Sequence, residues 1–384
     1  MRRVIHFVEP SKVGTYHISL IQGYLDALIG SGALTSRYEV ILHASASTYE
    51  NLSAAVRARV NFHRITVISQ DRRRLILKSL LELYAVVRVL LRRARGDIVF
   101  VSCVMPSALF LIELFASTFR TAAFFVVIHG EVEGLFQPTV GNLGSYGFWV
   151  LKWLQIRKAD SPLRIVVLDD FVKCNLLAEL GSKFAFGEIS VIHHPIAARA
   201  AAKPNVVGDI TLCFVGYRTP AKGFERFAAA SGRHPDLKCI AIGSGRIENL
   251  RQGTFAPLEN VDAYFRAISG CAAAVFPYVT GYSCALSAAV IDAISCGVHI
   301  IATNRPCFES LRAYFGANVV TIFGSQKELD LLLDHKEWLR ELSRHQEQTI
   351  EMLKHSKYGI EAVRASFEAL FLQEERLEAK LAST

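Results

Sequence analysis

The chain has 384 residues, of which 51% are hydrophobic and 20% are charged. This length favours two domains over one, and the composition excludes an intrinsically disordered protein. The net charge of +8 is uneven. Residues 1–196 hold 22 Lys and Arg against 15 Asp and Glu, whereas residues 197–384 hold 21 against 20. A negatively charged partner is therefore expected at the first half.

The amino terminus carries no secretory signal pattern, because Met1-Arg2-Arg3 leads directly into a very short apolar run. The most membrane-like run, residues 98–119, contains Pro106 and Glu113 and is more typical of a strand, a turn and a helix than of a membrane span. We expect a cytoplasmic protein, with peripheral contact to the inner face of the plasma membrane as an open alternative.

Short apolar runs alternate with helical segments in both halves, as in parallel sheets covered by helices on both faces. The fold class is therefore α/β. Rossmann-like domains are expected at residues 1–196 and 209–358, with a linker at 197–208 and a C-terminal helix at 359–384 that packs back toward the first domain. A helix over residues 18–29 lies between the first two strands. Strands are expected at 4–8, 40–44, 65–68, 98–101, 124–128, 165–168, 189–192, 210–215, 238–242, 271–276, 298–302 and 319–323.

The segment 72–95 predicts a helix with a basic stripe. Its polar side chains fall within an arc of roughly 140° on a helical wheel, and the rest of the wheel is mostly apolar. Either the helix covers a sheet with a solvated basic edge, or it lies on an anionic membrane surface. The polar arc consists of Arg74, Lys78, Glu82, Arg88, Arg92 and Arg95.

The second half opens with a strand followed by residues 216–223, Gly-Tyr-Arg-Thr-Pro-Ala-Lys-Gly. A glycine turn with Arg218 and Lys222 before a helix can hold a diphosphate through backbone N–H groups and two cations. An ordinary solvated turn is the alternative. Gly243 follows the next strand, where close backbone approach to a nucleotide would be feasible, although a lone Gly pair is weak evidence.

Several other residues follow strands in the order typical of a ligand site. His129 ends a strand in the first half and could contact a sugar or phosphate, or serve a structural role. Asp169-Asp170 is expected to begin a helix, with its two carboxylates pointing apart. His193-His194 is expected to shape the domain junction. Residues 276–309 read as strand, loop, helix, Gly turn and strand, and a ligand would lie at the loop 278–285.

No sequence pattern indicates a bound metal or cofactor. The eight cysteines form no CxxC pair and are expected to be reduced, buried thiols. No His/Cys cluster has metal spacing, and neither a convincing DxD pair, a GxSxG elbow nor a P-loop occurs. We therefore expect no cofactor and a metal-free mechanism, in which cations and helix dipoles stabilise a departing nucleoside diphosphate.

These residues together resemble the GT-B glycosyltransferases, specifically the group 1 or family 4-like enzymes of bacterial polysaccharide assembly. Their Gly-Arg-x-x-x-x-Lys-Gly motif is similar to residues 216–223, except that Tyr217 takes the Arg position and Arg218 follows it. Residues 290–298 resemble the family's Glu-Ala-Met-Ala-Cys-Gly stretch, and His129-Gly130 is similar to its first-domain His-Gly motif. The resemblance implies two Rossmann-like domains that face each other across a cleft.

The resemblance also implies roles. The second domain would bind the nucleotide-sugar, with Gly216 and Gly243 lining the site, Lys222 and Arg218 on the diphosphate, and Asp292 on the ribose. Cys284 stands where the family has a glutamate on the donor sugar, and Ser283 or Ser287 could supply a hydroxyl instead. His129 would contact the donor sugar or assist from across the cleft. The first domain would bind an acceptor, lipid-diphosphate-linked, beside Glu9, Gly14 and His17. Transfer would retain anomeric configuration.

Three alternatives compete with a glycosyltransferase. A nucleotide-sugar epimerase uses the same fold but would want several carboxylates and His in its site. A non-catalytic subunit of the same fold is conceivable because of Cys284 and Tyr217. Nucleic-acid binding is disfavoured despite the pI of 9.1, since no stacking aromatics interleave the basic run. Release of nucleoside diphosphate separates a transferase from an inert binder.

Overall fold

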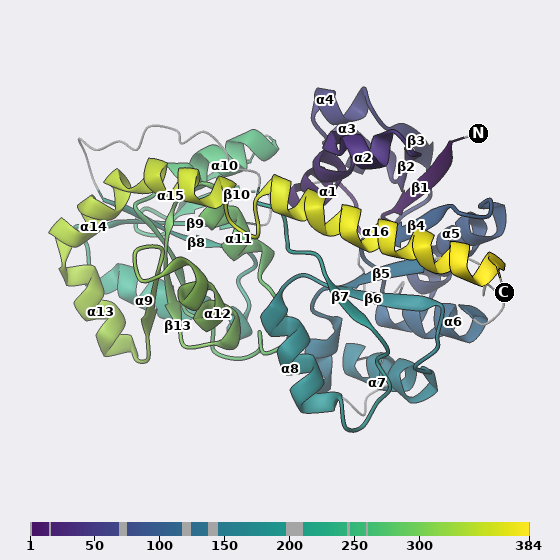
Figure 1. Ribbon diagram of the computed structural model, residues 1–384. Coiled ribbons are helices and arrows are strands. Elements are labelled where there is room, and N and C mark those ends of the chain that lie inside the picture. Colours follow the sequence, from purple (N-terminus) through teal and green to yellow (C-terminus); the bar gives the residue numbers. More distant parts are fainter. Residues whose placement is uncertain are drawn as a thin grey trace. The chain divides into compact units, whose positions relative to one another are not determined.

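The computed structural model describes residues 2–14, 17–68, 75–116, 124–136, 145–196, 210–243, 246–258 and 260–383. These residues form two compact units, each built on a seven-stranded sheet (Figure 1). The first unit comprises Met1–Pro195, Cys284–Leu286 and Ile360–Thr384, and the second comprises Ile196–Ser283 and Ser287–Gly359. The expected linker at 197–208 lies outside the described residues.

The sheet of the first unit is parallel throughout, in the order β3-β2-β1-β4-β5-β6-β7. The strand order reverses between β1 and β4, which is the point where open α/β sheets bind ligands. Its strands are β1 (Arg3–Val8), β2 (Tyr38–Ala44), β3 (Asn61–Arg64), β4 (Ile98–Val101), β5 (Phe124–Ile128), β6 (Leu163–Val167) and β7 (Ile189–Val191).

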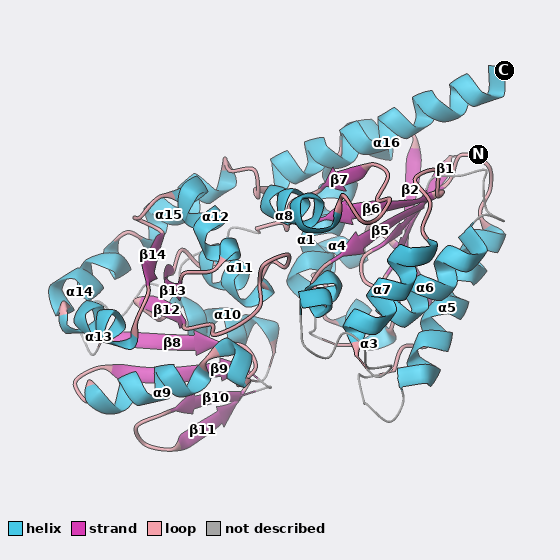
Figure 2. Cartoon of the chain, turned by 90° about the horizontal axis from the view of Figure 1, so that it is seen from below, coloured by secondary structure: helices cyan, strands magenta, loops and turns pink. Residues whose placement is uncertain are grey.

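Helices cover both faces of this sheet. In Figure 2, α5, α6 and α7 lie on the opposite side of the strands from α1 and α16, and α16 packs along α1. The helices and 3₁₀ turn of the first unit are α1 (Ile18–Gly30), α2 (Gly32–Thr35), α3 (Ala46–Glu50), α4 (Ala54–Arg57), α5 (Leu75–Arg92), α6 (Pro106–Ala116), η3 (Glu131–Phe136), α7 (Tyr146–Ile156), α8 (Asp170–Leu180) and α16 (Ile360–Ser383).

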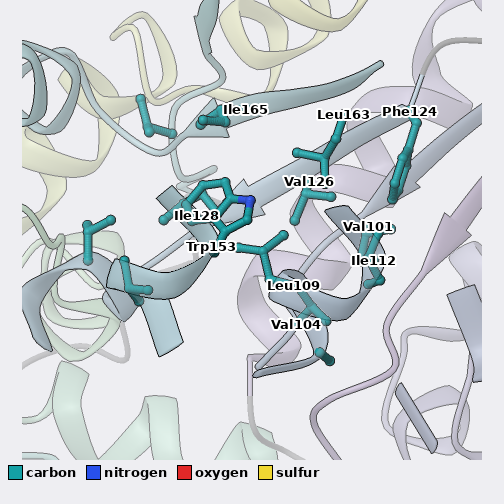
Figure 3. Close-up of a cluster of buried hydrophobic side chains, with 14 of the residues drawn as sticks. Val101, Val104, Leu109, Ile112, Phe124, Val126, Ile128, Trp153, Leu163 and Ile165 are labelled. Carbon is teal, nitrogen blue, oxygen red and sulfur yellow. The ribbon is translucent and has the colours of Figure 1, made fainter. Parts of the chain in front are cut away.

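The core beneath α5, α6, α7 and α8 is centred on large apolar side chains (Figure 3). Trp153 is fully buried there, and its indole N–H donates to the Glu113 carboxylate at 2.9 Å. Arg157 pairs with the same carboxylate at 2.9 Å and donates to two backbone carbonyls, so the buried charges are compensated. Truncating a fully buried Trp typically costs about 3–5 kcal/mol.

The sheet of the second unit has the order β11-β10-β9-β8-β12-β13-β14, and only the β9-β10-β11 edge is antiparallel. Its strand order reverses between β8 and β12. The strands are β8 (Thr211–Val215), β9 (Lys238–Gly243), β10 (Arg246–Asn249), β11 (Thr254–Pro257), β12 (Ala273–Phe276), β13 (His299–Thr303) and β14 (Val320–Phe323).

The second unit is completed by one 3₁₀ turn and seven α-helices in the described residues. They are η4 (Pro220–Lys222), α9 (Phe224–Arg233), α10 (Val261–Ser269), α11 (Ala288–Ser295), α12 (Pro306–Phe315), α13 (Gln326–Asp334), α14 (Lys336–Arg344) and α15 (Gln346–Lys354). Several begin with the expected side-chain caps. Ser325, for example, accepts from the Glu328 backbone N–H at 3.2 Å while Glu328 reaches back to the Gly324 N–H.

The predicted fold class, α/β with two Rossmann-like units, is confirmed. The predicted strand at residues 65–68 is wrong, because β3 ends at Arg64. That edge strand is largely exposed, so it lacks the apolar pattern by which a buried strand is recognised. The hairpin of β10 and β11 was not predicted, for the same reason: β11 is exposed along its whole length.

Helix α5 does not expose the whole polar arc that the helical wheel predicts. Lys78 and Glu82, expected on a polar edge, are buried and form an ion pair at 3.3 Å. Arg88, Arg92 and Arg95 are exposed, and Arg74 lies outside the described residues. A wheel orders side chains around the axis but cannot say which side faces the sheet. Within the described residues, no helix is long and apolar enough to cross a membrane.

Candidate active site

Most of the candidate residues lie where parallel strands end at the reversal points of the two sheets. In the first unit, Glu9 follows β1, Ser102 and Cys103 follow β4, and His129 follows β5. In the second unit, Gly216 follows β8, Gly243 ends β9, and the loop that leads to α11 follows β12. Each unit therefore has its own group of candidate residues at these strand ends, the first half-site in the first unit and the second half-site in the second.

Gly216 and Gly243 bring two strand ends of the second unit into backbone contact. Gly216 has φ of +116°, in the region that favours glycine. A Cβ on Gly243 would lie 2.3 Å from the Gly216 carbonyl oxygen, so only glycine fits there. The sequence signal for Gly243 was weak, and the structure supplies a packing reason for it. Neither glycine is thereby shown to touch a ligand.

Lys222 is the most informative side chain of the second half-site. Its Nζ lies 2.9 Å from the point that a Cβ on Gly216 would occupy, so the ammonium reaches back over the end of β8. It also lies 5.5 Å from the centroid of the Tyr278 ring. Burial lowers the pKa of Lys222 to about 8. In the part of the second unit that the structure describes, Lys222 has no carboxylate partner, so an anionic ligand would relieve the cost of its burial.

Arg218 is already engaged. Its guanidinium forms an ion pair with Glu248 of β10 and lies 4.7 Å from the centroid of the Phe224 ring. Sequence reasoning could not see this partner, because β10 was not predicted. Arg218 would therefore have to leave Glu248, or share it, in order to bind a diphosphate.

Asp292 lies on α11 and is half-buried. The Tyr264 hydroxyl of α10 donates to its Oδ2 at 3.0 Å. This bond fixes the carboxylate and leaves it an acceptor of the kind that ribose hydroxyls require. Burial, then the nearby Asp292 carboxylate, raises the pKa of Tyr264, which stays a donor at neutral pH. Sequence reasoning identified Asp292 and missed Tyr264, which carries no motif.

The serines before α11 differ in their surroundings. Ser287 stands at the N-cap of α11 and is buried, and its hydroxyl hydrogen-bonds the Tyr278 hydroxyl at 2.9 Å. Ser283 is half-buried in the loop. Tyr278, fully buried, thus connects Ser287 with the Lys222 ammonium through its ring.

Cys284 belongs to the first unit. It is fully buried in the apolar cluster of that unit, and its backbone N–H donates to the Glu133 carboxylate at 2.9 Å. Burial raises the pKa of the thiol to about 12, so it is protonated at neutral pH. A side chain in such surroundings is a packing group, and this placement gives no support to the expectation that it contacts a donor sugar.

Glu9, expected to border an acceptor, is fully buried and organises the loop after β1. One carboxylate oxygen accepts from the Ser11 and Lys12 backbone N–H groups at 3.0 and 2.8 Å, and the other accepts from the Ser102 hydroxyl at 2.7 Å. Gly14, with φ of +66°, donates its N–H to Ser47. These residues shape the loop that leads to His17.

His17 and His129 lie together. Their rings stack with centroids 4.7 Å apart. Burial lowers the pKa of His129 to about 4, so its imidazole is neutral. Its Nε2 is hydrogen-bonded to the Ser102 carbonyl. Because a carbonyl oxygen only accepts, Nε2 carries the proton, which leaves Nδ1 as an acceptor. His17 has φ of 60°, unusual for a side chain with a Cβ, and its Nδ1 is buried without a hydrogen-bond partner.

The structure also brings together residues that the sequence gave no reason to combine. Ligand atoms of His17, Cys103 and His129 all lie within 4.8 Å of one another and could hold a metal ion. Those of Asp169, Asp170 and His193 do likewise, so the expectation that the two carboxylates point apart is wrong. As expected, Asp169 caps α8 by accepting from the Phe171 N–H. His193 contacts Asp170 at 3.0 Å.

Lys12 and Glu131 are two further charged residues of the first half-site that sequence reasoning missed. Cys103, then the carboxylates of Glu131 and Glu9, raise the pKa of Lys12. Burial raises the pKa of Glu131, which accepts from the His129 backbone N–H at 2.7 Å. Neither residue stands in a recognisable motif; only the meeting of β1, β4 and β5 places them together.

No protein-family model matches the sequence, and no curated protein is significantly similar to it. Solved structures are similar over nearly their whole length. Sucrose-phosphate synthase from Thermosynechococcus elongatus is 14% identical with a TM-score of 0.67, over 97% of this chain and 99% of that one. Trehalose-6-phosphate synthase OtsA is 9% identical with a TM-score of 0.61, over 97% and 99%. Anabaena HepE in complex with UDP-glucose is 11% identical with a TM-score of 0.60, over 96% and 99%.

These three structures are GT-B glycosyltransferases, so the expected GT-B fold is confirmed. At 9–14% identity the likeness establishes the fold alone.

Proposed function

We propose that this protein is a glycosyltransferase that moves a hexose from a nucleotide-sugar donor to a saccharide acceptor in cell-surface polysaccharide assembly. The observation that carries the proposal is the Lys222 ammonium, partly buried beside Gly216 without a carboxylate partner in the described residues. A nucleoside diphosphate would supply the missing negative charge. The complexes of HepE with UDP and with UDP-glucose support UDP-sugars as the first donors to test.

In this proposal the second unit holds the donor. Lys222 and backbone N–H groups at the end of β8 stabilise the negative charge that develops on the departing diphosphate, which is the largest single contribution in many such reactions. Asp292, held by Tyr264, accepts hydrogen bonds from the ribose hydroxyls. Arg218 contributes only if the diphosphate competes with Glu248.

The first unit holds the acceptor in this proposal. His129 is neutral and presents Nδ1 as an acceptor, which suits a hydrogen bond from a sugar hydroxyl. His17 and the loop organised by Glu9 border the same strand ends. We also infer that transfer retains anomeric configuration and needs no metal ion. Both follow from the family resemblance, and the metal test matters because His17, Cys103 and His129 could bind one.

The test is product analysis with a panel of UDP-, GDP- and dTDP-sugars, with and without EDTA and membrane lipid extract. A transferase releases nucleoside diphosphate with one donor and attaches the sugar to an acceptor, and Lys222→Ala slows this release by about 100-fold. If no donor yields nucleoside diphosphate in any condition, the transferase proposal fails. The anomeric configuration of the product, read by NMR, decides retention.

A nucleotide-sugar epimerase is the second candidate, because Glu131, His17 and His129 lie together at the end of β5 and the start of α1. Such a group of acid and imidazole side chains suits proton transfer at a sugar carbon. An epimerase would convert one nucleotide-sugar into another without any acceptor. Chromatography of the nucleotide-sugar pool in the same assay separates the two reactions.

A further inference from the structure

Helix α5 presents apolar side chains to solvent and charged ones to the protein interior. Five exposed apolar residues form what we call the α5 apolar row: Ile76, Leu77, Leu80, Tyr84 and Leu91. Ile76 is 80% exposed, Leu91 71% and Tyr84 62%. Side chains three and four positions apart lie on one face of a helix, so these residues form one continuous stripe. Leu114 and Phe115 of the neighbouring α6 are also about half exposed.

The charges on this face have one sign. Arg88 and Arg92 are exposed in the last two turns of the helix, and Arg95 is exposed just after it. The one acidic residue of α5, Glu82, is 1% exposed and pairs with Lys78 on the inner side. In the described residues, the outer face of α5 has apolar side chains and arginines but no carboxylate. Such a face is complementary to an anionic lipid surface, where apolar groups insert and arginines contact phosphates. Two copies of this face would set arginines against arginines.

We propose that the α5 apolar row and Arg88, Arg92 and Arg95 bind the surface of a bilayer that contains anionic lipids. The helix lies in the interface and does not cross the membrane, in agreement with the absence of a spanning helix in the described residues. This surface binding requires no catalytic activity, so it can be tested independently of the proposed transferase activity.

The inner side of α5 gives this binding a consequence for the acceptor. Lys78 donates to the Ser11 carbonyl of the loop after β1, and Glu82 accepts from the Met105 N–H after β4 at 2.6 Å. Helix α5 is thus hydrogen-bonded to the loop that leads to His17. If the proposed function holds, docking of α5 brings that loop to the surface from which a lipid-linked acceptor is presented.

Co-sedimentation with vesicles tests the proposal directly. The protein is mixed with phosphatidylglycerol–phosphatidylcholine vesicles and with pure phosphatidylcholine vesicles. We expect binding to the anionic vesicles, weakened by salt. Replacing Arg88, Arg92 and Arg95 together by Gln should lower the partition coefficient by about 100-fold. Replacing Ile76, Leu80 and Leu91 by Ser should also abolish sedimentation.

Matched controls come from the second unit. Gln at Lys327, Arg340 and Arg344 removes the same number of exposed cations, and Leu331→Ser removes one leucine that is 52% exposed, close to Leu80 at 50%. These variants should bind as the wild type does. All substituted side chains are exposed, and thermal melting verifies that each variant is folded.

Three outcomes would overturn the proposal: no binding to anionic vesicles by the wild type, undiminished binding by both α5 variants, or equal loss in the controls. A fourth would assign the face to a second copy instead, namely a dimer in analytical ultracentrifugation that the Ser variant dissociates while vesicles have no effect. Donor hydrolysis without vesicles, measured in parallel, reports on the transferase alone.

Discussion

Two lysines, one in each unit, show how differently a buried ammonium can be used. Lys78 is 2% exposed and pairs with Glu82 at 3.3 Å, and its remaining protons meet backbone carbonyls. Lys222 is partly buried, approaches the end of β8 and has no carboxylate partner in the described part of its unit. The first set of contacts is complete, whereas the second lacks an anion.

This difference indicates that Lys78 stabilises the fold and that Lys222 binds a ligand. A buried charge is neutralised by its ion-pair partner, so removal of that charge lowers the free energy of unfolding. A buried cation without a partner destabilises the free protein and is neutralised only by a bound anion. Its removal therefore weakens the binding of that anion. The following predictions separate the two roles.

The largest effect is expected for Lys78→Met. It leaves the Glu82 carboxylate buried and unpaired, which should lower the free energy of unfolding by about 3–5 kcal/mol. Urea denaturation measures the loss. The double variant Lys78→Met with Glu82→Leu should recover most of it, whereas Lys222→Met removes an unpaired buried charge and should not lower stability. Equal destabilisation by Lys222→Met would remove the distinction between the two lysines.

Lys222→Ala should lower turnover by about 100-fold, because the departing diphosphate loses its cation. Lys222→Arg keeps the charge and should keep a larger part of the activity. Steady-state kinetics measure both, with the donor that the panel of nucleotide-sugars selects. A Lys222→Ala enzyme with nearly normal kcat would show that the diphosphate is neutralised elsewhere, with Arg218 the first residue to examine.

The pH dependence of kcat/KM should report the same group. Burial lowers the pKa of Lys222 to about 8, so the ammonium is present below that pH and is lost as pH rises through it. Above pH 8, kcat/KM should fall about tenfold per pH unit. In Lys222→Arg this alkaline limb should disappear, since a guanidinium keeps its proton there. An unchanged limb would assign the titration to another group.

The smallest effect is expected for Tyr264→Phe. It removes the hydrogen bond to Asp292 without changing the ring, which should raise the donor KM by about 2- to 10-fold with little change in kcat. Asp292→Asn serves as the matched variant and should raise the KM at least as much. If Tyr264→Phe alters kcat and leaves KM alone, Asp292 does not bind the ribose.

Much of the fold could be predicted because parallel strands are buried on both faces and read as apolar runs. Strands such as β4 and β5 were predicted at their observed bounds for this reason. The exposed strands β3, β10 and β11 carry no such pattern. In α5, the helix itself was predictable but its orientation was not. Lys78 and Glu82 are charged and so predict an exposed side of the helix, but both are buried as an ion pair.

The candidate site was predictable only where a motif exists. Gly216, Lys222 and Asp292 stand at recognisable spacings. Lys12, Glu131 and Tyr264 do not, and they join the half-sites only through sheet topology and helix packing. Sequence spacing also could not show that Arg218 already pairs with Glu248, which lies on a strand that was not predicted.

Helix α16 has a consequence for the order in which the protein folds. It belongs to the first unit, where Phe367 and Phe371 pack against Phe100, although Ile360 follows Pro195 only after the whole second unit has been synthesised. At typical translation rates that interval is about 10–30 s. During this time one face of the first sheet has no cover from α16. We therefore expect the second unit to finish folding first, and the nascent first unit to depend on chaperones until α16 has left the ribosome.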